Sequence, residues 1–275
     1  MEYDTIMLEK EGSIVILTLN RPDHGNSFDN RMMRESDYAL RQMGDDHAIR
    51  AVIITGAGEY FSTGIDLSMF TGEQTHGNKK SSEKYFLPAE NDEVYGSGTT
   101  VASVIRIKSM PKPVIAAVNG PAVGLGFSLA LACDMMIASD RAKFSLVFVK
   151  RGIVPDAGAS FNLPRVVGLP RAFELALTGE TIDAREAERI GMLNRIISHN
   201  DLLKSAKDLA NKIAENPPLA VGKTKEMLYQ AMAEQNMVEH MKREVELQNE
   251  LLKTADFREA ATAFMEKRKP VFKGE

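Results

Sequence analysis

The segment KPVIAAVNGPAVGLGFSLALACD, residues 112–134, combines a strand, a glycine-bearing turn and a helix. Val114 to Val118 is short, apolar and partly β-branched, which is typical of a buried strand. Glycines and a proline punctuate residues 119–124 and favour tight turning. Leu125 to Ala132 then reads as an apolar helix. The segment therefore predicts a buried strand that passes through a tight turn directly into a helix.

Similar segments lie on either side of it. Further buried strands are expected at Ser13 to Leu19, Ala51 to Thr55 and Met135 to Ala138. Helix-like stretches cover Asp29 to Met43 and Thr99 to Lys108. Short buried strands that alternate with helices favour an α/β fold.

The character of the chain changes after residue 200, where consecutive helices are expected over 201–215, 219–235, 237–253 and 256–269. Leu, Met and Val on one face of this region must be buried on the main domain or on another subunit. We therefore expect an α/β core over 1–200 and a helical oligomerisation region over 201–275. Residues 71–98 are polar and charged, and we interpret them as an insertion that is either a solvated loop or a flap over a site.

Composition excludes several classes of protein. The 275 residues carry 34 Lys and Arg against 38 Asp and Glu, a balance that argues against nucleic acid as a principal partner. No run approaches the ~20 apolar residues that a membrane span needs, and the N-terminal residues do not resemble a secretory signal. The single cysteine, Cys133, lies in an apolar stretch and indicates a reducing cytoplasm.

Two glycine-bearing turns follow predicted strands: FSTGIDL at 61–67 and NGPAVGLGFS at 119–128. A turn of this kind leaves backbone N–H groups unpaired at a helix start, where they can bind a phosphate or hold an oxyanion. A dinucleotide fingerprint does not fit, because its third glycine position falls on Leu129. The alternative is that the glycines serve tight turning alone.

Together the motifs resemble those of the crotonase superfamily, the enoyl-CoA hydratases and isomerases. The resemblance runs from about residue 13 to 270 without the insertion, and its motifs are residues 20–22, 61–67, 112–120, 132–134, 155–158, 163–165, 176–180, 184–191 and 264–268. It implies a spiral of repeated β-β-α units and a C-terminal helical region that makes a homotrimer or a dimer of trimers. It also implies an acyl-CoA thioester substrate and no separate cofactor, since coenzyme A is part of the substrate.

By position, the backbone N–H groups of Ile65 and Leu125 would form an oxyanion hole for the thioester carbonyl. Hydratases of the superfamily use two glutamates, and the matching positions here are Ser128 and Phe148. An aspartate, Asp156, stands instead where epoxyphenylacetyl-CoA isomerases, dienoyl-CoA isomerases and chlorobenzoyl-CoA dehalogenases keep one. Residues 148–156 are most similar to the epoxyphenylacetyl-CoA isomerases.

Asp156 is bracketed by apolar residues, which can raise the pKa of its carboxyl toward a useful value for a general base. The alternative interpretation is a helix N-cap. The resemblance places coenzyme A near Asn26, Ser27, Phe28, Ser62, Gly64, Asp66, Leu67 and Lys267, and the acyl pocket near Gly124, Ser128 and Phe148. The five histidines have no metal-ligand spacing, so no metal is expected.

The leading hypothesis is a cytoplasmic enoyl-CoA isomerase in which Asp156 moves a proton between carbons 2 and 4 of the acyl chain, through an enolate held at Ile65 and Leu125. The second is hydration, with another acid from the insertion: Glu83, Glu90, Asp92 or Glu93. A nucleophilic role for Asp156 is a third. A non-catalytic acyl-CoA-binding protein is the alternative outside enzymes.

Overall fold

The central strands of the large sheet are buried on both faces. The computed structural model describes residues 3–71 and 99–275, so the four candidate acids of the insertion lie outside the described residues. The sheet order is β1 (Ile6–Glu11), β2 (Ile14–Leu19), β3 (Ala51–Gly56), β4 (Val114–Val118), β6 (Met135–Ser139) and β9 (Arg195–Ile197). Only the pairing of β1 with β2 is antiparallel in this sheet.

Register explains why the strands are apolar almost throughout. Ile16 pairs with Ile53, which pairs with Ile115, and these side chains form a row on one face of the sheet. Their neighbours in sequence, such as Val15 and Val52, point to the opposite face and enter the larger core cluster. A strand with both faces buried shows no polar alternation, which is why the predicted strands were readable as apolar runs.

A second, smaller sheet consists of β5 (Ala122–Val123), β7 (Lys143–Ser145) and β8 (Thr181–Asp183). β4 leads into β5, and β6 leads into β7, so each turn of the chain adds one strand to each sheet. Isolated bridges between Ser62 and Ala122 and between Phe28 and Ile65 continue this pattern upstream. The expected spiral of β-β-α units is confirmed.

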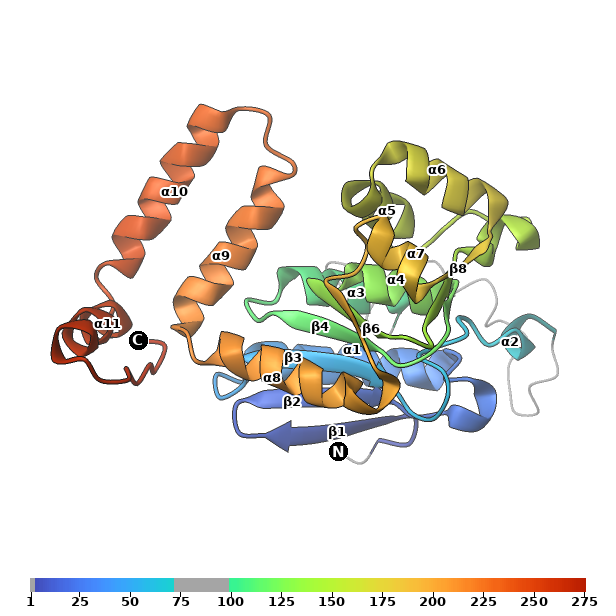
Figure 1. Ribbon diagram of the computed structural model, residues 1–275, viewed down its shortest axis with the longest axis horizontal. Helices are drawn as coiled ribbons and strands as arrows, with labels where there is room; N and C mark the ends of the chain where they lie inside the picture. The colour runs from blue at the N-terminus through green and yellow to red at the C-terminus, as the bar shows by residue number, and fades with distance from the viewer. Residues whose placement is uncertain (1–2, 72–98) are drawn as a thin grey trace, which may run out of the picture.

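Helices cover the sheet on both sides (Figure 1). α1 (Asn30–Asp45), α3 (Thr100–Ser109) and α4 (Leu125–Ala132) contribute to the larger core, together with α5 (Ala159–Val167), α6 (Leu169–Thr178) and α7 (Ala184–Arg189). α8 (Leu202–Ala214) covers the other face through Leu202, Ala206 and Ala210. α8 therefore packs directly on the sheet of the α/β core, although it follows residue 200.

The C-terminal arm, residues 218–275, projects from this body. Figure 1 shows α9 (Pro218–Ala231) and α10 (Met237–Leu251) as a helical pair that extends from the body, with α11 (Ala255–Glu266) near its base. Nine large apolar side chains of the arm are between 49% and 86% exposed, namely Leu228, Met232, Met237, Val238, Met241, Val245, Phe264, Met265 and Val271. No helix among residues 3–71 and 99–275 is long and apolar enough to cross a membrane.

A buried polar cluster anchors the arm to the body. Lys225 of α9 lies 2.7 Å from Asp134 and also donates to the carbonyl groups of Ile107 and Lys112. Tyr229 donates to Asp134 at 2.6 Å and accepts from Lys108 at 2.9 Å. Because these buried charges are paired and hydrogen-bonded, the cluster fixes where α9 leaves the body.

Candidate active site

The two glycine-bearing turns lie side by side. Ser62 N donates to the carbonyl of Pro121 at 3.1 Å, and Val123 N donates to the carbonyl of Ser62 at 2.9 Å. This parallel pairing brings the residues that follow, Ile65 and Leu125, to the same place in the fold. An ideal Cβ built on Gly64 would lie 3.3 Å from the backbone nitrogen of Leu125.

Glycine is required at two positions of this contact. Gly64 has φ +99°, and a Cβ there would lie 2.8 Å from the carbonyl oxygen of Val123. A Cβ at Gly126 would lie 2.5 Å from the carbonyl oxygen of Ser62. Real Cβ atoms do not approach other atoms this closely. Glycine is therefore needed at both positions so that the backbones of the two turns can lie in contact.

The backbone N–H groups of Ile65 and Leu125 are available as donors. Phe28 N donates to the carbonyl of Gly64 at 2.7 Å and Asp66 N donates to the carbonyl of Phe28 at 2.9 Å, so the N–H of Ile65 points away from Phe28. Leu125 opens α4, where an N–H has no partner inside the helix. Neither N–H has a hydrogen-bond acceptor within the described part of the chain. Two free backbone donors on adjacent turns can hold a developing oxyanion.

Asp156 stands in a strained turn before α5. The N-cap of α5 is Gly158, and no side chain caps the helix, so the N-cap interpretation of Asp156 is wrong. Ala157 and Gly158 have φ +46° and +75°, and a left-handed alanine is costly enough to occur mainly where the surroundings impose it. Asp156 therefore precedes the N-cap of α5 by two residues.

The carboxyl group of Asp156 has the properties of a base. Its Oδ1 is buried and has no hydrogen-bond partner among the described residues. Burial raises the pKa of Asp156 to about 6, against a smaller opposing effect from its own backbone N–H. A buried carboxylate with one oxygen that accepts no hydrogen bond gains a proton readily, which suits it to proton transfer near neutral pH. α5 packs against α4, the helix that Leu125 opens.

Neither position that matches a hydratase glutamate supplies an acid. Ser128 is completely buried, and its hydroxyl donates to the carbonyl of Gly124 at 3.3 Å. Phe148 is also buried, and its Cζ lies 4.0 Å from an ideal Cβ at Gly124. Phe148 and Gly124 are therefore neighbours, whereas the Ser128 hydroxyl is engaged with backbone.

Two of the positions expected near coenzyme A stabilise the turns of the site. Asn26 and Ser62 are completely buried, and their side chains hydrogen-bond to the backbone of these turns. Asn26 accepts from Arg21 N and donates to the carbonyls of Ala57 and Tyr60, and Ser62 Oγ accepts from Gly64 N. Both side chains shape the loops rather than face solvent, so a direct contact with a ligand is not available to them here.

Arg21 contacts residues of this site, but no role was predicted for it from the sequence, where it is part of the motif at 20–22. Its guanidinium donates to the carbonyl of Ser27 at 2.6 Å and lies 3.0 Å from Asp66. Burial opposes ionisation of Asp66, but hydrogen bonds from Ser68 and Arg21 outweigh it and lower the pKa of that carboxyl. Arg21 therefore ties the Ser27 loop to the Asp66 turn.

The remaining expected positions differ in exposure. Ser27 and Phe28 are buried, and Leu67 is 55% exposed beside them. Lys267 ends α11 with φ +54°, and α11 and α2 (Ser68–Thr71) lie at opposite ends of the molecule in Figure 1. Lys267 is therefore not brought together with the Asp66 turn of its own chain. Within the described ranges, no group of three or more His, Cys, Asp or Glu can hold a metal ion.

Comparison with known proteins gives one consistent result. A sequence model described as enoyl-CoA hydratase/isomerase matches residues 9–275. The chain is 37% identical to the short-chain-enoyl-CoA hydratase of Clostridium acetobutylicum over 98% of this chain and 97% of that protein. It is 36% identical to the 1,2-epoxyphenylacetyl-CoA isomerase of Escherichia coli over 100% and 99%. The crystal structure of an enoyl-CoA hydratase from Bacillus anthracis superposes with a TM-score of 0.89 at 32% identity, over 99% of this chain and 100% of that one.

Proposed function

The chain belongs to the enoyl-CoA hydratase/isomerase family, and we propose that it isomerises the double bond of an unsaturated acyl-CoA thioester with Asp156 as its single base. The observation that carries this proposal is the buried Oδ1 of Asp156, which has no hydrogen-bond partner among the described residues. Ser128 and Phe148 occupy the positions where a hydratase would carry its acids. The likeness to a 1,2-epoxyphenylacetyl-CoA isomerase supports the same choice.

In this mechanism the thioester oxygen accepts from the N–H groups of Ile65 and Leu125. Asp156 takes a proton from carbon 2 of a 3-enoyl chain, and the electrons move onto the thioester oxygen as a dienolate. The two N–H groups stabilise the negatively charged oxygen of the dienolate more strongly than the oxygen of the neutral carbonyl. Catalysis requires this difference. The carboxyl group of Asp156 then returns the proton to carbon 4, and the double bond shifts to carbons 2 and 3.

Hydration is the second candidate, because curated relatives such as that of Clostridium acetobutylicum are named hydratases. Hydration needs one group to deprotonate water and another to protonate carbon 2. Asp156 alone would have to serve both positions, or an acid outside the described residues would have to join it. Isomerisation asks only for one carboxylate that accepts and returns a proton.

A panel of coenzyme A esters, analysed by liquid chromatography to resolve the double-bond isomers and by mass spectrometry to detect added water, distinguishes these reactions. We expect 3-enoyl-CoA esters to convert to 2-enoyl-CoA without a change of mass, because no water is added. A saturated acyl-CoA of the same chain length is the control, since it can undergo neither reaction. Products that have gained one water would contradict isomerisation, and the absence of any product across the panel would favour a non-catalytic binding protein.

We also propose that the protein is a homotrimer, or a pair of trimers, held by the C-terminal arm. Met237, Met241 and Val245 follow one another at a spacing of four residues and form an exposed apolar stripe on α10. A stripe of this kind, left uncovered by residues 3–71 and 99–275, is costly in water and marks an interface.

Replacing Met241 and Val245 together by lysine should dissociate the assembly, because two charges would be buried at the interface. The matched control is Glu246→Lys on the same helix, which adds a lysine at a side chain that is 64% exposed and leaves the stripe intact. Analytical ultracentrifugation would measure both. A wild-type monomer, or an unchanged mass for the double variant, would show that the arm is not the interface.

A further inference from the structure

Asn119 directly follows β4, and its side chain reaches the loop that leaves β3. The backbone N of Gly56 donates to its Oδ1 at 3.1 Å, and its Nδ2 donates to the carbonyls of Gly58 at 2.9 Å and Tyr60 at 3.3 Å. Asn119 is only 8% exposed. Both polar atoms of this buried amide are therefore used to hold the segment between β3 and the turn at 61–67.

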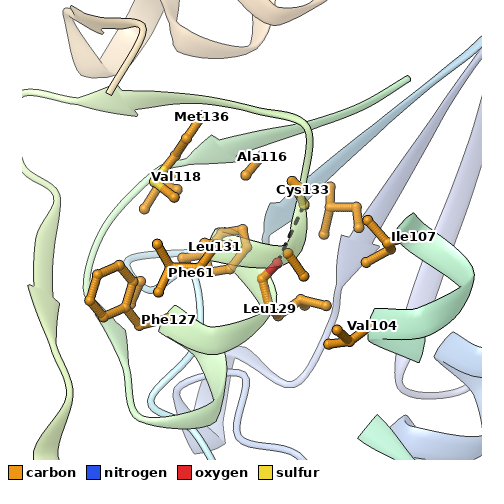
Figure 2. Packing of buried hydrophobic residues seen from close by; sticks show 14 of the residues in the cluster. Phe61, Val104, Ile107, Ala116, Val118, Phe127, Leu129, Leu131, Cys133 and Met136 are labelled. Atoms are coloured by element: carbon orange, nitrogen blue, oxygen red, sulfur yellow. Dashed lines mark hydrogen bonds between the residues drawn. The ribbon is translucent and has the colours of Figure 1, made fainter. Parts of the chain in front are cut away.

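The segment that Asn119 holds has no apolar anchor of its own. Residues 58–60 are exposed, whereas Phe61 after them and Val118 before Asn119 are completely buried. Figure 2 shows both of these side chains in one apolar cluster. An exposed loop whose side chains do not pack is fixed mainly by its backbone hydrogen bonds. Its path to Phe61 therefore depends on the amides of Asn26 and Asn119.

Asn119 also begins the segment that leads to Leu125. An ideal Cβ on Gly120 would overlap the carbonyl oxygen of Glu59, so the two loops touch beside the Asn119 side chain. Because the two free backbone donors follow on these loops, a displacement of either loop would move Ile65 relative to Leu125.

A histidine from the edge of the sheet holds the backbone of Asn119. His199 follows the edge strand β9 and opens the short helix η3 (His199–Asp201). Its Nδ1 lies 3.1 Å from the carbonyl oxygen of Asn119. Because a carbonyl oxygen can only accept, Nδ1 carries the proton in this hydrogen bond. His199 therefore ties the edge of the sheet to the end of β4 across 80 residues of sequence.

Two residues at the end of β6 fix the position of His199. Asp140 Oδ1 accepts from the backbone N of His199 at 3.1 Å and from the hydroxyl of Ser139 at 3.2 Å. The Oγ of Ser139, which is completely buried, lies 3.2 Å from Nδ1 of the ring. The imidazole is thus held between Ser139 and Asn119. A donor that is itself ordered by a network can keep a backbone carbonyl in one position.

We infer that Asn119 and His199 are positioning residues for the oxyanion site. The side chain of Asn119 joins the loops that lead to Ile65 and Leu125. The ring of His199 in turn fixes the backbone of Asn119. The inference rests on the proposed function, because it assigns the two backbone N–H groups to the thioester oxygen. Both residues act through the placement of these donors and not through the base, Asp156.

Asn119→Ala should lower kcat by about 10–100-fold, because a misplacement of about 1 Å can cost ~100-fold. The KM for a 3-enoyl-CoA ester should change by less than about threefold, since the displaced donors act mainly on charge that develops during the reaction. Steady-state kinetics measures both constants.

The matched control is Asn194→Ala. The Oδ1 of Asn194 accepts from the backbone N of Met136 at 2.8 Å, near the start of β6 and thus at the opposite end of the sheet. This variant removes the same amide from a strand end but leaves both loops intact, so its turnover should equal that of the wild type.

His199→Leu and His199→Asn separate the hydrogen bond from the shape of the side chain. Leucine places a carbon where the ring has Nδ1. The amide nitrogen of asparagine is bonded to Cγ, as Nδ1 is, and can donate to Asn119. We expect kcat to fall about three- to tenfold in His199→Leu, the equivalent of one hydrogen bond, and to be restored in His199→Asn.

Infrared spectra of a saturated acyl-CoA, isotopically labelled at the thioester carbonyl carbon, measure the two donors without turnover. In the wild type, the donors should lower the carbonyl stretching frequency of the bound ester relative to the free ester. Asn119→Ala should lose most of this shift, whereas Asn194→Ala and Asp156→Asn should keep it. A general loss of stability would not change the spectrum of the molecules that remain folded.

Wild-type kcat together with an unchanged carbonyl shift in Asn119→Ala would overturn the inference even if isomerisation is observed. An unshifted carbonyl in the wild type would overturn it as well. A shift that is lost in Asn119→Ala, with hydration as the only reaction, would support the inference and overturn only the proposed reaction. If Asn119→Ala does not fold, equal kcat and equal carbonyl shifts in His199→Leu and His199→Asn would overturn the inference.

Discussion

Replacing Asp156 by Asn should lower turnover by ~100–10,000-fold, the loss typical of a general base. Asparagine keeps the size of the side chain but cannot accept the proton that leaves carbon 2. Affinity for coenzyme A should stay within a few fold, because Asp156 takes part in no hydrogen bond that holds the turns at Asn26 or Asp66. Steady-state kinetics on a 3-enoyl-CoA ester and calorimetry with coenzyme A measure the two effects separately.

Asp183→Asn is the matched control. Asp183 caps α7 by accepting from Glu186 N, and asparagine caps a helix about equally well. The same chemical change at this exposed position should leave turnover unaltered. Near wild-type turnover of Asp156→Asn would remove Asp156 from the mechanism.

The pH dependence follows from the raised pKa of Asp156. Its carboxylate must be ionised to act as a base, so kcat/KM should rise with pH through about 6 and level off above it. In the unfolded chain this pKa is near 3.8, so the native state binds more protons between about pH 4 and pH 6. Asp156 therefore destabilises the fold above pH 6, and Asp156→Asn should raise the free energy of unfolding at pH 7 by about 1–3 kcal/mol. An activity profile that is flat between pH 5 and 8 would contradict this assignment.

Gly64→Ala should lower kcat by about 100–1,000-fold, the range for loss of one oxyanion donor. The added Cβ would meet the carbonyl oxygen of Val123 at 2.8 Å and the nitrogen of Leu125 at 3.3 Å, so the two turns must separate. The N–H groups of Ile65 and Leu125 would then no longer converge on one oxygen. The reduction should appear in kcat, because these donors act most strongly on the charge that develops during the reaction.

Gly191→Ala controls for backbone strain. Gly191 has φ +78°, close to that of Gly64, but an added Cβ would meet nothing within 4 Å. Both variants pay the cost of a left-handed alanine, whereas only Gly64→Ala disturbs the paired turns. A loss of stability in both with a loss of turnover in Gly64→Ala alone would support the oxyanion site. Equal turnover of the two variants would argue against it.

The fold could be predicted where the burial of a segment is indicated by a run of apolar residues at consecutive positions. The expected strand Val114–Val118 and helix Leu125–Ala132 have those bounds in the structure. β1 was missed because four of its six residues are exposed and Glu9, Lys10 and Glu11 give it a charged, edge-strand composition. β5 contains two residues, so no periodicity can reveal it, and only its pairing with β7 makes it a strand.

The sequence by itself determined the family resemblance and the buried strands. It also predicted Asp156 as the base, because the resemblance matches Ser128 and Phe148 to the two glutamates of a hydratase. Only the tertiary structure decided that Gly158 caps α5, that the Asp156 Oδ1 stays unpartnered and that Asn26 is consumed in holding a turn. The physical reason is the range of each interaction. Hydrophobic periodicity reports burial over a few residues, whereas the partner of a polar atom, or its lack of one, depends on backbone that is distant in sequence and close in space.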